Sequence, residues 1–239
     1  MTGSPGATGA QVGTTDDGPT GAEVRARLGI ARVLHALVAL VALTGVVMEL
    51  VIAVADGPGA APNQTERLVR LFSYFTIQSN LLIGGVSLAL ALDPRRDGPL
   101  FRVLRLDALL CIAVTGIVYN TVLRGLVTLT PSGAVANMML HVLAPLLAVV
   151  VWLWVGPRPR VSVRTVWWSV VYPIAWLVYT FVRGAATGWY PYPFLDVTVL
   201  GYGPALTNAT LIAVVFLVLA WGVRWADVRL PHTDRSVRA

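Results

Sequence analysis

The chain has 239 residues, of which 56% are hydrophobic and only 13% are charged. A water-soluble domain of this size carries about 25% charged residues, so the composition predicts a membrane protein. All 18 basic residues are arginine. The lack of lysine excludes a retinal Schiff base and any covalent mechanism that uses a lysine amine.

The N-terminal segment 1–24 is rich in Gly, Thr, Ala and Pro, and we expect a disordered cytoplasmic tail. Residues 24–31 are expected to lead into the first helix as a short amphipathic segment. Six apolar runs follow, each close to the ~20 residues that span a membrane. They cover residues 32–55, 71–92, 105–127, 135–155, 165–183 and 204–226. The first run begins too late and is too long for a cleavable signal peptide.

These runs predict an all-α fold, a polytopic bundle of six transmembrane helices over residues 25–226. A short polar tail over 227–239 is expected to be cytoplasmic. Fourteen arginines fall on the side that holds both termini, and four fall on the other side, at 67, 70, 124 and 183. By the positive-inside rule, both termini are cytoplasmic in the cell (plasma) membrane. This placement disfavours nucleic-acid binding, and no protein partner is evident.

The segment from Gly188 to Phe194 is short, aromatic and stiffened by prolines, and it joins the last two predicted helices. Two interpretations are open: a cap folded back onto the bundle, or an anchor at the lipid interface. The single cysteine, Cys111, lies inside the third run, so no intramolecular disulfide can form. It is expected to be a packing residue.

Polar residues gather in the half of the predicted membrane away from the termini. Thr76 and His141 both come out at about 8–9 Å below the outer boundary. Ser73, Thr76 and Asn80 share one helix face, and Asn137 and His141 share another. If both faces turn inward, the hydroxyl can reach the imidazole, which is the minimum arrangement for an activated nucleophile.

An asparagine could orient the histidine or stabilise an oxyanion, and the candidates are Asn80, Asn137 and Asn120. Further polar residues of the expected cavity are Glu49, Ser73, Tyr119, Tyr179 and Asn208. An ionised Glu49 needs a partner, for which Arg124 or Arg183 is available on the same side. A structural alternative is open for all of them, because such side chains also join membrane helices through hydrogen bonds.

Metal and cofactor chemistry is not expected. His35 and His141 differ in depth by more than ~10 Å, which disfavours axial ligation of a haem. Clustered histidine and carboxylate ligands of a metal hydrolase are absent from the sequence. We therefore predict no cofactor and no metal.

Several segments resemble a family of actinobacterial integral membrane proteins. They are Ser73–Leu82 (SYFTIQSNLL), Val114–Asn120 (VTGIVYN), Leu140–Pro145 (LHVLAP) and Arg183–Asp196. The resemblance covers most of residues 30–225. That family looks distantly similar to the eukaryotic androgen-induced gene family of six-helix membrane hydrolases.

The resemblance implies hydrolysis of fatty acid esters with Thr76 as nucleophile and His141 as its partner. The residues after Thr76 depart slightly from the eukaryotic spacing. We therefore expect a membrane hydrolase that cleaves a lipid ester in a polar cavity open to the outer leaflet. A non-catalytic lipid-binding or transport protein with the same cavity is the alternative, and a purely structural bundle is a third interpretation.

Overall fold

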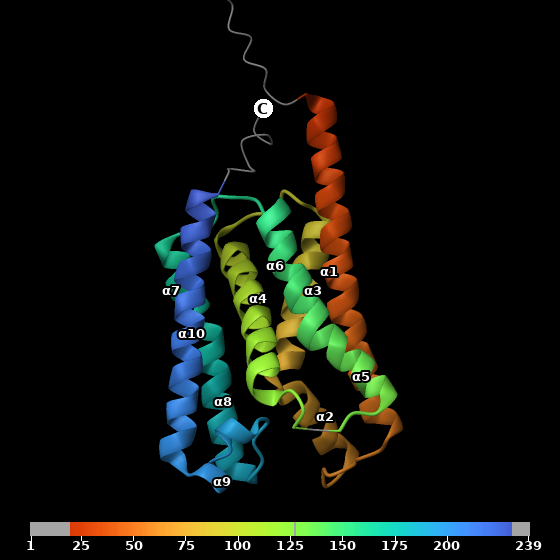
Figure 1. The fold of residues 1–239 in the computed structure, drawn as a ribbon, viewed down its shortest axis with the longest axis vertical. Coiled ribbons are helices and arrows are strands. Elements are labelled where there is room, and N and C mark those ends of the chain that lie inside the picture. The colour runs from red at the N-terminus through yellow and green to blue at the C-terminus, as the bar shows by residue number, and fades with distance from the viewer. Residues whose placement is uncertain (1–19, 127, 231–239) are drawn as a thin grey trace, which may run out of the picture.

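The computed structural model describes residues 20–126 and 128–230, so most of both predicted tails lies outside the described residues. All the regular secondary structure of the described part is helical, and this part contains no strand. Six of its helices are long and apolar enough to cross a membrane, as the sequence predicts (Figure 1). Their bounds are Gly21–Ala55, Phe75–Leu92, Pro99–Leu123, Pro131–Val155, Val163–Thr187 and Tyr202–Arg229.

The first span, α1 (Gly21–Ala55), begins well before its apolar run at residue 32. Thr20 and Glu23 form a reciprocal capping box that satisfies the first amides and starts the helix there. At 1.5 Å per residue the helix is about 52 Å long, which exceeds a ~30 Å hydrocarbon core. It accordingly extends beyond the other helices at the end where it begins (Figure 1).

The prediction of one helix over 71–92 is wrong at its start, because the helix is interrupted at Tyr74. A separate helix, α2 (Gln64–Ser73), ends there, and the second span, α3 (Phe75–Leu92), begins one residue later. Tyr74 has an extended backbone, with ψ near 130°. The Trp176 indole N–H donates to the Ser73 carbonyl at 3.0 Å, replacing the helical donor that this carbonyl lacks. Thr76 is thereby placed in the first turn of α3.

The third and fourth spans each contain a π-helical turn. The third consists of α4 (Pro99–Val118) and the turn η1 (Tyr119–Leu123). The fourth consists of α5 (Pro131–Met138), the turn η2 (Met139–Leu143) and α6 (Ala144–Val155). Such turns occur often at functional sites, because they shift the helix register by one residue.

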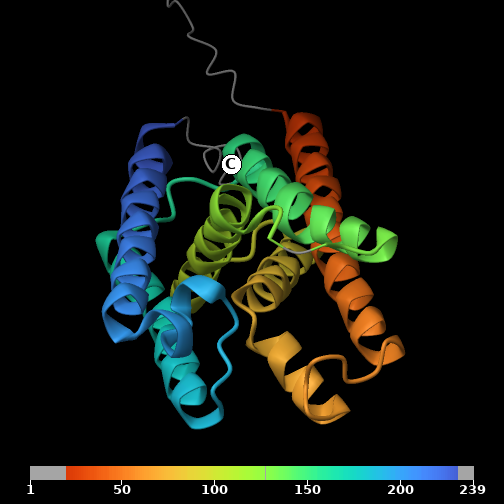
Figure 2. The same ribbon diagram turned by 60° about the horizontal axis from the view of Figure 1, so that its bottom comes forward.

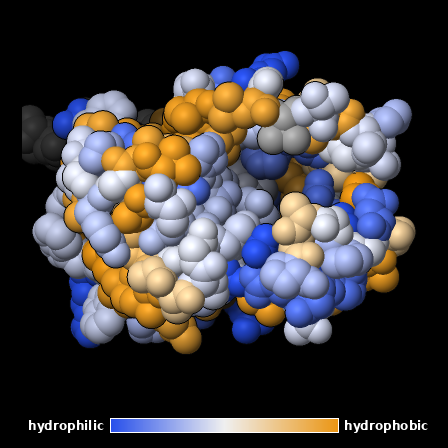
Figure 3. All heavy atoms as spheres, turned by 90° about the horizontal axis from the view of Figure 1, so that it is seen from below, coloured by the Kyte–Doolittle hydropathy of each residue, from blue (hydrophilic) through white to orange (hydrophobic). Residues whose placement is uncertain are grey.

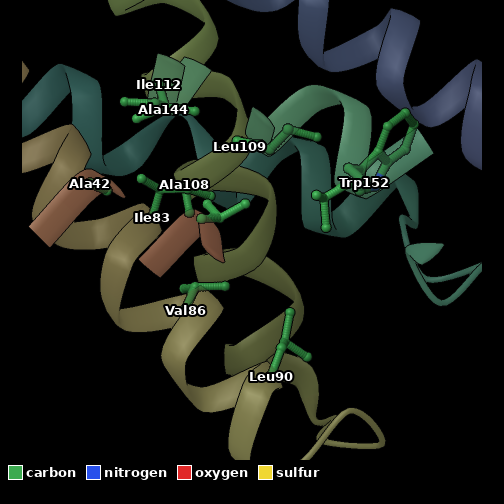
Figure 4. Close-up of a cluster of buried hydrophobic side chains, with 12 residues drawn as sticks. Ala42, Ile83, Val86, Leu90, Ala108, Leu109, Ile112, Ala144 and Trp152 are labelled. Carbon is green, nitrogen blue, oxygen red and sulfur yellow. The ribbon is translucent and has the colours of Figure 1, made fainter. Parts of the chain in front are cut away.

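The main core joins α1, α3, α4 and α6 (Figure 4). Ala42, Ala108 and Ala144 are completely buried, and their small side chains let the helix backbones approach closely. Ile83, Ile112 and Trp152 fill the remaining space. Large aliphatic side chains elsewhere on the spans are exposed, as expected for a surface that faces lipid rather than water.

The remaining helices stand on the other side of α4 from α1 and α2 (Figure 2). They are α7 (Val163–Ser169), α8 (Val171–Thr187), η3 (Pro193–Leu195), α9 (Val197–Leu200) and α10 (Tyr202–Arg229). The start of α1 and the end of α10 lie at the same end of the bundle, which we call the terminal end (Figure 1). The opposite end, which carries α2 and α9, is called the α2 end, and it is hollowed near its middle (Figure 3).

Candidate active site

Thr76 and His141 are brought together at the α2 end. The Thr76 hydroxyl oxygen, Oγ1, lies 3.2 Å from Nε2 of His141. Thr76 is buried in the first turn of α3, and His141 is half-buried in the π-helical turn η2. The expected approach of the two helix faces is therefore present, at hydrogen-bond distance.

The direction of this hydrogen bond follows from the other nitrogen of the ring. Nδ1 of His141 lies 3.2 Å from the backbone carbonyl of Asn137. A carbonyl can only accept, so Nδ1 carries the hydrogen, and Nε2 of the neutral ring is the acceptor. The Thr76 hydroxyl must then donate to Nε2. This is the arrangement in which a histidine can remove the proton from a hydroxyl nucleophile.

The position of His141 depends on two carbonyls that the helix leaves without donors. In a regular α-helix, the amides of residues 144 and 145 would bond the carbonyls of Leu140 and His141. The Ala144 amide bonds Met139 instead, because of the π-helical turn, and Pro145 has no amide hydrogen. Both carbonyls therefore need partners from neighbouring helices.

Two of the three asparagines proposed from the sequence supply those partners. Asn80 Nδ2 donates to the carbonyl of Leu140 at 3.2 Å, and also to that of Thr76 at 2.9 Å. Asn120 Nδ2 donates to the carbonyl of His141 at 3.3 Å, and to that of Gly116 at 2.8 Å. Their amide hydrogens are engaged with main chain, so the geometry favours an orienting role and disfavours the oxyanion role.

The third asparagine, Asn137, orients the ring from both sides. Its carbonyl accepts from Nδ1 of His141, and its side chain donates to the Tyr119 hydroxyl at 2.6 Å. The Tyr119 ring stacks on the imidazole with centroids 4.2 Å apart and planes inclined by 28°. Tyr119, predicted only as a polar residue of a cavity, therefore restrains the plane of the imidazole.

Sequence analysis missed Tyr192, whose side chain contacts Thr76 directly. Its hydroxyl lies 3.2 Å from Thr76 Oγ1 and accepts the Thr76 amide hydrogen, also at 3.2 Å. Because it accepts there, it can donate its own hydrogen to Oγ1. Burial raises the pKa of Tyr192 to about 12, so the phenol is neutral and remains a donor near pH 7. In the sequence, the aromatic segment 188–194 was the feature that could have pointed to Tyr192. Its interpretation as a cap folded back onto the bundle is confirmed.

A charged and aromatic cluster attaches this cap to α2. Glu66 accepts hydrogen bonds from Arg70 at 2.8 Å and from Arg183 at 2.6 Å. The Trp189 ring lies against both guanidinium groups, 5.1 Å from Arg70 and 4.8 Å from Arg183. The hydrogen bond from Arg70 has the larger effect and the one from Arg183 the next, and both lower the pKa of Glu66 below its ordinary value. The cluster joins α2, α8 and the cap at the α2 end.

The remaining predicted cavity residues do not contact the Thr76–His141 pair. Ser73 and Tyr179 share a hydrogen bond of 2.7 Å, and Asn208 donates to the carbonyl of Phe194 at 2.9 Å. Glu49 is half-buried and forms no ion pair within the described residues, so the expected pairing with Arg124 or Arg183 is wrong. Arg183 pairs with Glu66 instead.

The cavity beside Thr76 is apolar, which corrects the expectation of a polar one. It has a volume of about 250 Å³ and lies between α4, α8 and α10. Thr76 and Tyr192 line it, whereas His141, Glu49, Ser73, Tyr119, Tyr179 and Asn208 do not. Its apolar lining residues include Val114, Val118, Ile174, Leu177, Ile212, Ala213, Phe216 and Leu217. Ser73, Tyr119, Tyr179 and Asn208 instead form hydrogen bonds with other side chains or with the backbone.

One edge of this cavity reaches the outer surface of the bundle. Ile174 and Trp167, both among its lining residues, are 54% and 57% exposed. These exposed apolar side chains belong to the lipid-facing surface beside α8. An extended apolar group could therefore enter sideways from the membrane and reach the Thr76 hydroxyl.

Within the described residues, no three His, Cys, Asp or Glu side chains are grouped as a metal site would require. The groups that meet at the site are the Thr76 hydroxyl, the His141 imidazole and the Tyr192 phenol. No family model, curated protein or solved structure matches this chain, and the interpretation of the site accordingly rests on its own geometry.

Proposed function

We propose that this protein is an integral membrane hydrolase that cleaves a lipid ester of the fatty-acyl type. The observation that carries the proposal is the oriented contact between Thr76 Oγ1 and His141 Nε2, at 3.2 Å. The carbonyl of Asn137 holds the ring in the tautomer that accepts the hydroxyl proton. The family resemblance of the sequence implies the same two roles, with a slight departure from the eukaryotic spacing after Thr76.

In the proposed reaction, Thr76 Oγ1 attacks the acyl carbon while its proton passes to Nε2 of His141. The carbonyl oxygen becomes an oxyanion, and the Tyr192 hydroxyl turns its hydrogen from Oγ1 to that oxygen. The oxyanion collapses, the C–O bond of the ester breaks, and His141 protonates the departing alcohol. A water molecule, deprotonated by His141, then attacks the acyl carbon of the acyl-threonine. The bond from that carbon to Oγ1 breaks, His141 returns the proton to Oγ1, and the fatty acid is released.

The apolar cavity supports an acyl chain as the group that lies beside Thr76. A hydrocarbon chain suits a wall of aliphatic and aromatic side chains, and it needs no polar partner. The exposed edge near Ile174 supports entry from the membrane, and no cofactor is proposed. The arginine distribution supports a plasma-membrane protein with its terminal end in the cytoplasm and the site toward the outer leaflet.

A non-catalytic lipid-binding or transport function is the second candidate. It is favoured by one observation: the cavity is lined by Thr76 but not by His141. In that case Thr76 would donate a hydrogen bond to a bound lipid and would not form a covalent bond.

A fluorophosphonate ester-hydrolase probe distinguishes the two functions. The purified protein would be compared with Thr76→Val, Thr76→Ser and His141→Gln, each checked for folding by its melting temperature. Thr210→Val is the matched control, because its hydroxyl donates only to the Leu206 carbonyl of its own helix.

The hydrolase proposal expects labelling of wild type, Thr76→Ser and Thr210→Val. It expects no labelling of Thr76→Val and His141→Gln. An unlabelled wild type, with a serine hydrolase labelled in the same membranes, would favour the lipid-binding function. Labelling that persists in Thr76→Val would mean that another residue is the nucleophile.

A further inference from the structure

A second group of buried polar side chains lies in the half of the bundle near the terminal end. His35 of α1, Ser87 of α3 and Arg105 of α4 line one small cavity. Its remaining walls are apolar, and its volume is about 20 Å³. None of these three residues belongs to the Thr76–His141 site.

The polar atoms that border this cavity have no partner within the described residues. Nδ1 of His35 and Nη2 of Arg105 are buried without a hydrogen bond. Ser87 is 2% exposed, and its hydroxyl also forms no hydrogen bond, although a serine in a helix commonly bonds the carbonyl four residues earlier. Three groups able to donate hydrogen bonds therefore surround one space.

The positive charge of Arg105 is not neutralised by a direct ion pair. Its Nη1 donates to the carbonyl of Pro157 at 3.2 Å, and no carboxylate of the described residues lies within 4.0 Å of it. The nearby carboxylate of Asp227 accepts from the amides of Arg160 and Val161, at 2.7 and 2.8 Å. The carboxylate of Asp227 attracts the guanidinium without pairing with it directly. Because Nη2 is buried without a hydrogen-bond partner, the position favours an anion close to that atom.

From these observations we propose that His35, Ser87 and Arg105 bind one small inorganic anion of halide size, chloride being the abundant representative. The volume suits a single small species, of the size of a water molecule or a halide ion, better than phosphate, sulfate or a lipid headgroup. A water molecule would satisfy some of the donors but would place no negative charge in direct contact with the guanidinium. The bound anion would join α1, α3 and α4, and this role is independent of ester hydrolysis.

Thermal unfolding of the detergent-solubilised full chain tests the site. Sodium gluconate is replaced stepwise by sodium chloride at constant ionic strength, with sodium bromide and sodium sulfate in parallel series. We expect chloride and bromide to raise the melting temperature along a saturable curve. The rise should be about 5–11 °C at a hundredfold excess over the Kd. Sulfate should give no saturable rise.

The variants Ser87→Ala and Arg105→Gln should shift the chloride midpoint at least tenfold or abolish the response. Ser169→Ala is the matched control, because this buried hydroxyl already donates to the carbonyl of Val166 at 2.8 Å. It should keep the wild-type midpoint. An equal response to chloride and gluconate, a sulfate response as large as that to chloride, or an unchanged midpoint in Ser87→Ala would each overturn the proposal in favour of a water molecule.

Discussion

Pro145 stands four residues after His141 and deprives the His141 carbonyl of its helical donor. The carbonyl is instead held by Asn120 from the neighbouring helix. The π-helical turn likewise removes the helical donor of the Leu140 carbonyl, which accepts a hydrogen bond from Asn80 instead. The ring of His141 is thus positioned by two cross-helix hydrogen bonds that a regular α-helix would not permit.

Replacement of Pro145 by alanine should therefore change the position of the His141 ring more than it changes the melting temperature of the protein. The new amide can donate to the His141 carbonyl, which favours a regular helix and turns the imidazole away from Thr76. We expect the rate of fluorophosphonate labelling to fall by about tenfold to a hundredfold, since a displacement near 1 Å costs about that much. The melting temperature should stay unchanged or rise. Pro131→Ala, at the start of α5, is the control and should keep the wild-type rate.

Removal of the Tyr192 hydroxyl tests its proposed role as oxyanion donor. Tyr192→Phe keeps the buried ring but removes the hydrogen bonds to Thr76 Oγ1 and to the Thr76 amide. Loss of one oxyanion donor costs about 10²–10³ in rate, so ester turnover should fall by that factor. Stability should fall by about 1 kcal/mol. Turnover within twofold of wild type, measured on a folded variant, would contradict the role.

The six spans could be predicted from the sequence because membrane thickness sets the length of an apolar run. The polar faces that carry Thr76 and His141 were also predictable, since helical spacing determines which residues share a face. The ends of the spans were less predictable, because the capping box at Thr20 extends α1 far beyond its apolar run.

Features that arise from contacts between distant segments could not be predicted. The break at Tyr74 depends on Trp176, more than 100 positions later, which takes the Ser73 carbonyl. The π-helical turns leave no pattern in hydropathy, although a proline four residues after a histidine inside an apolar run was a usable signal. Tyr192 could be placed near Thr76 only once the cap was known to fold inward.

Docking of the cap requires a glycine at position 184. A Cβ there would lie 2.1–2.6 Å from ring atoms of Tyr190, which is too close for any side chain. Gly184→Ala should therefore displace the cap, lower the melting temperature by several degrees and reduce labelling of Thr76, since overpacking costs about 1–3 kcal/mol. Gly222→Ala is the control, because its Cβ would meet nothing within 4 Å. Equal melting temperatures for both variants would show that the cap is not held this way.

The apolar cavity makes a prediction about the length of the acyl chain. Ala213 of α10 lines the cavity, whereas its neighbour Val214 is exposed on the lipid-facing surface. Ala213→Phe should fill part of the 250 Å³ and exclude long chains. We expect turnover of a long-chain ester to fall at least tenfold relative to that of a short-chain ester, because about two buried methylenes at ~0.8 kcal/mol each lose their site. Val214→Phe should leave the ratio unchanged. If both variants gave the wild-type ratio while remaining folded, the acyl chain would have to lie outside this cavity.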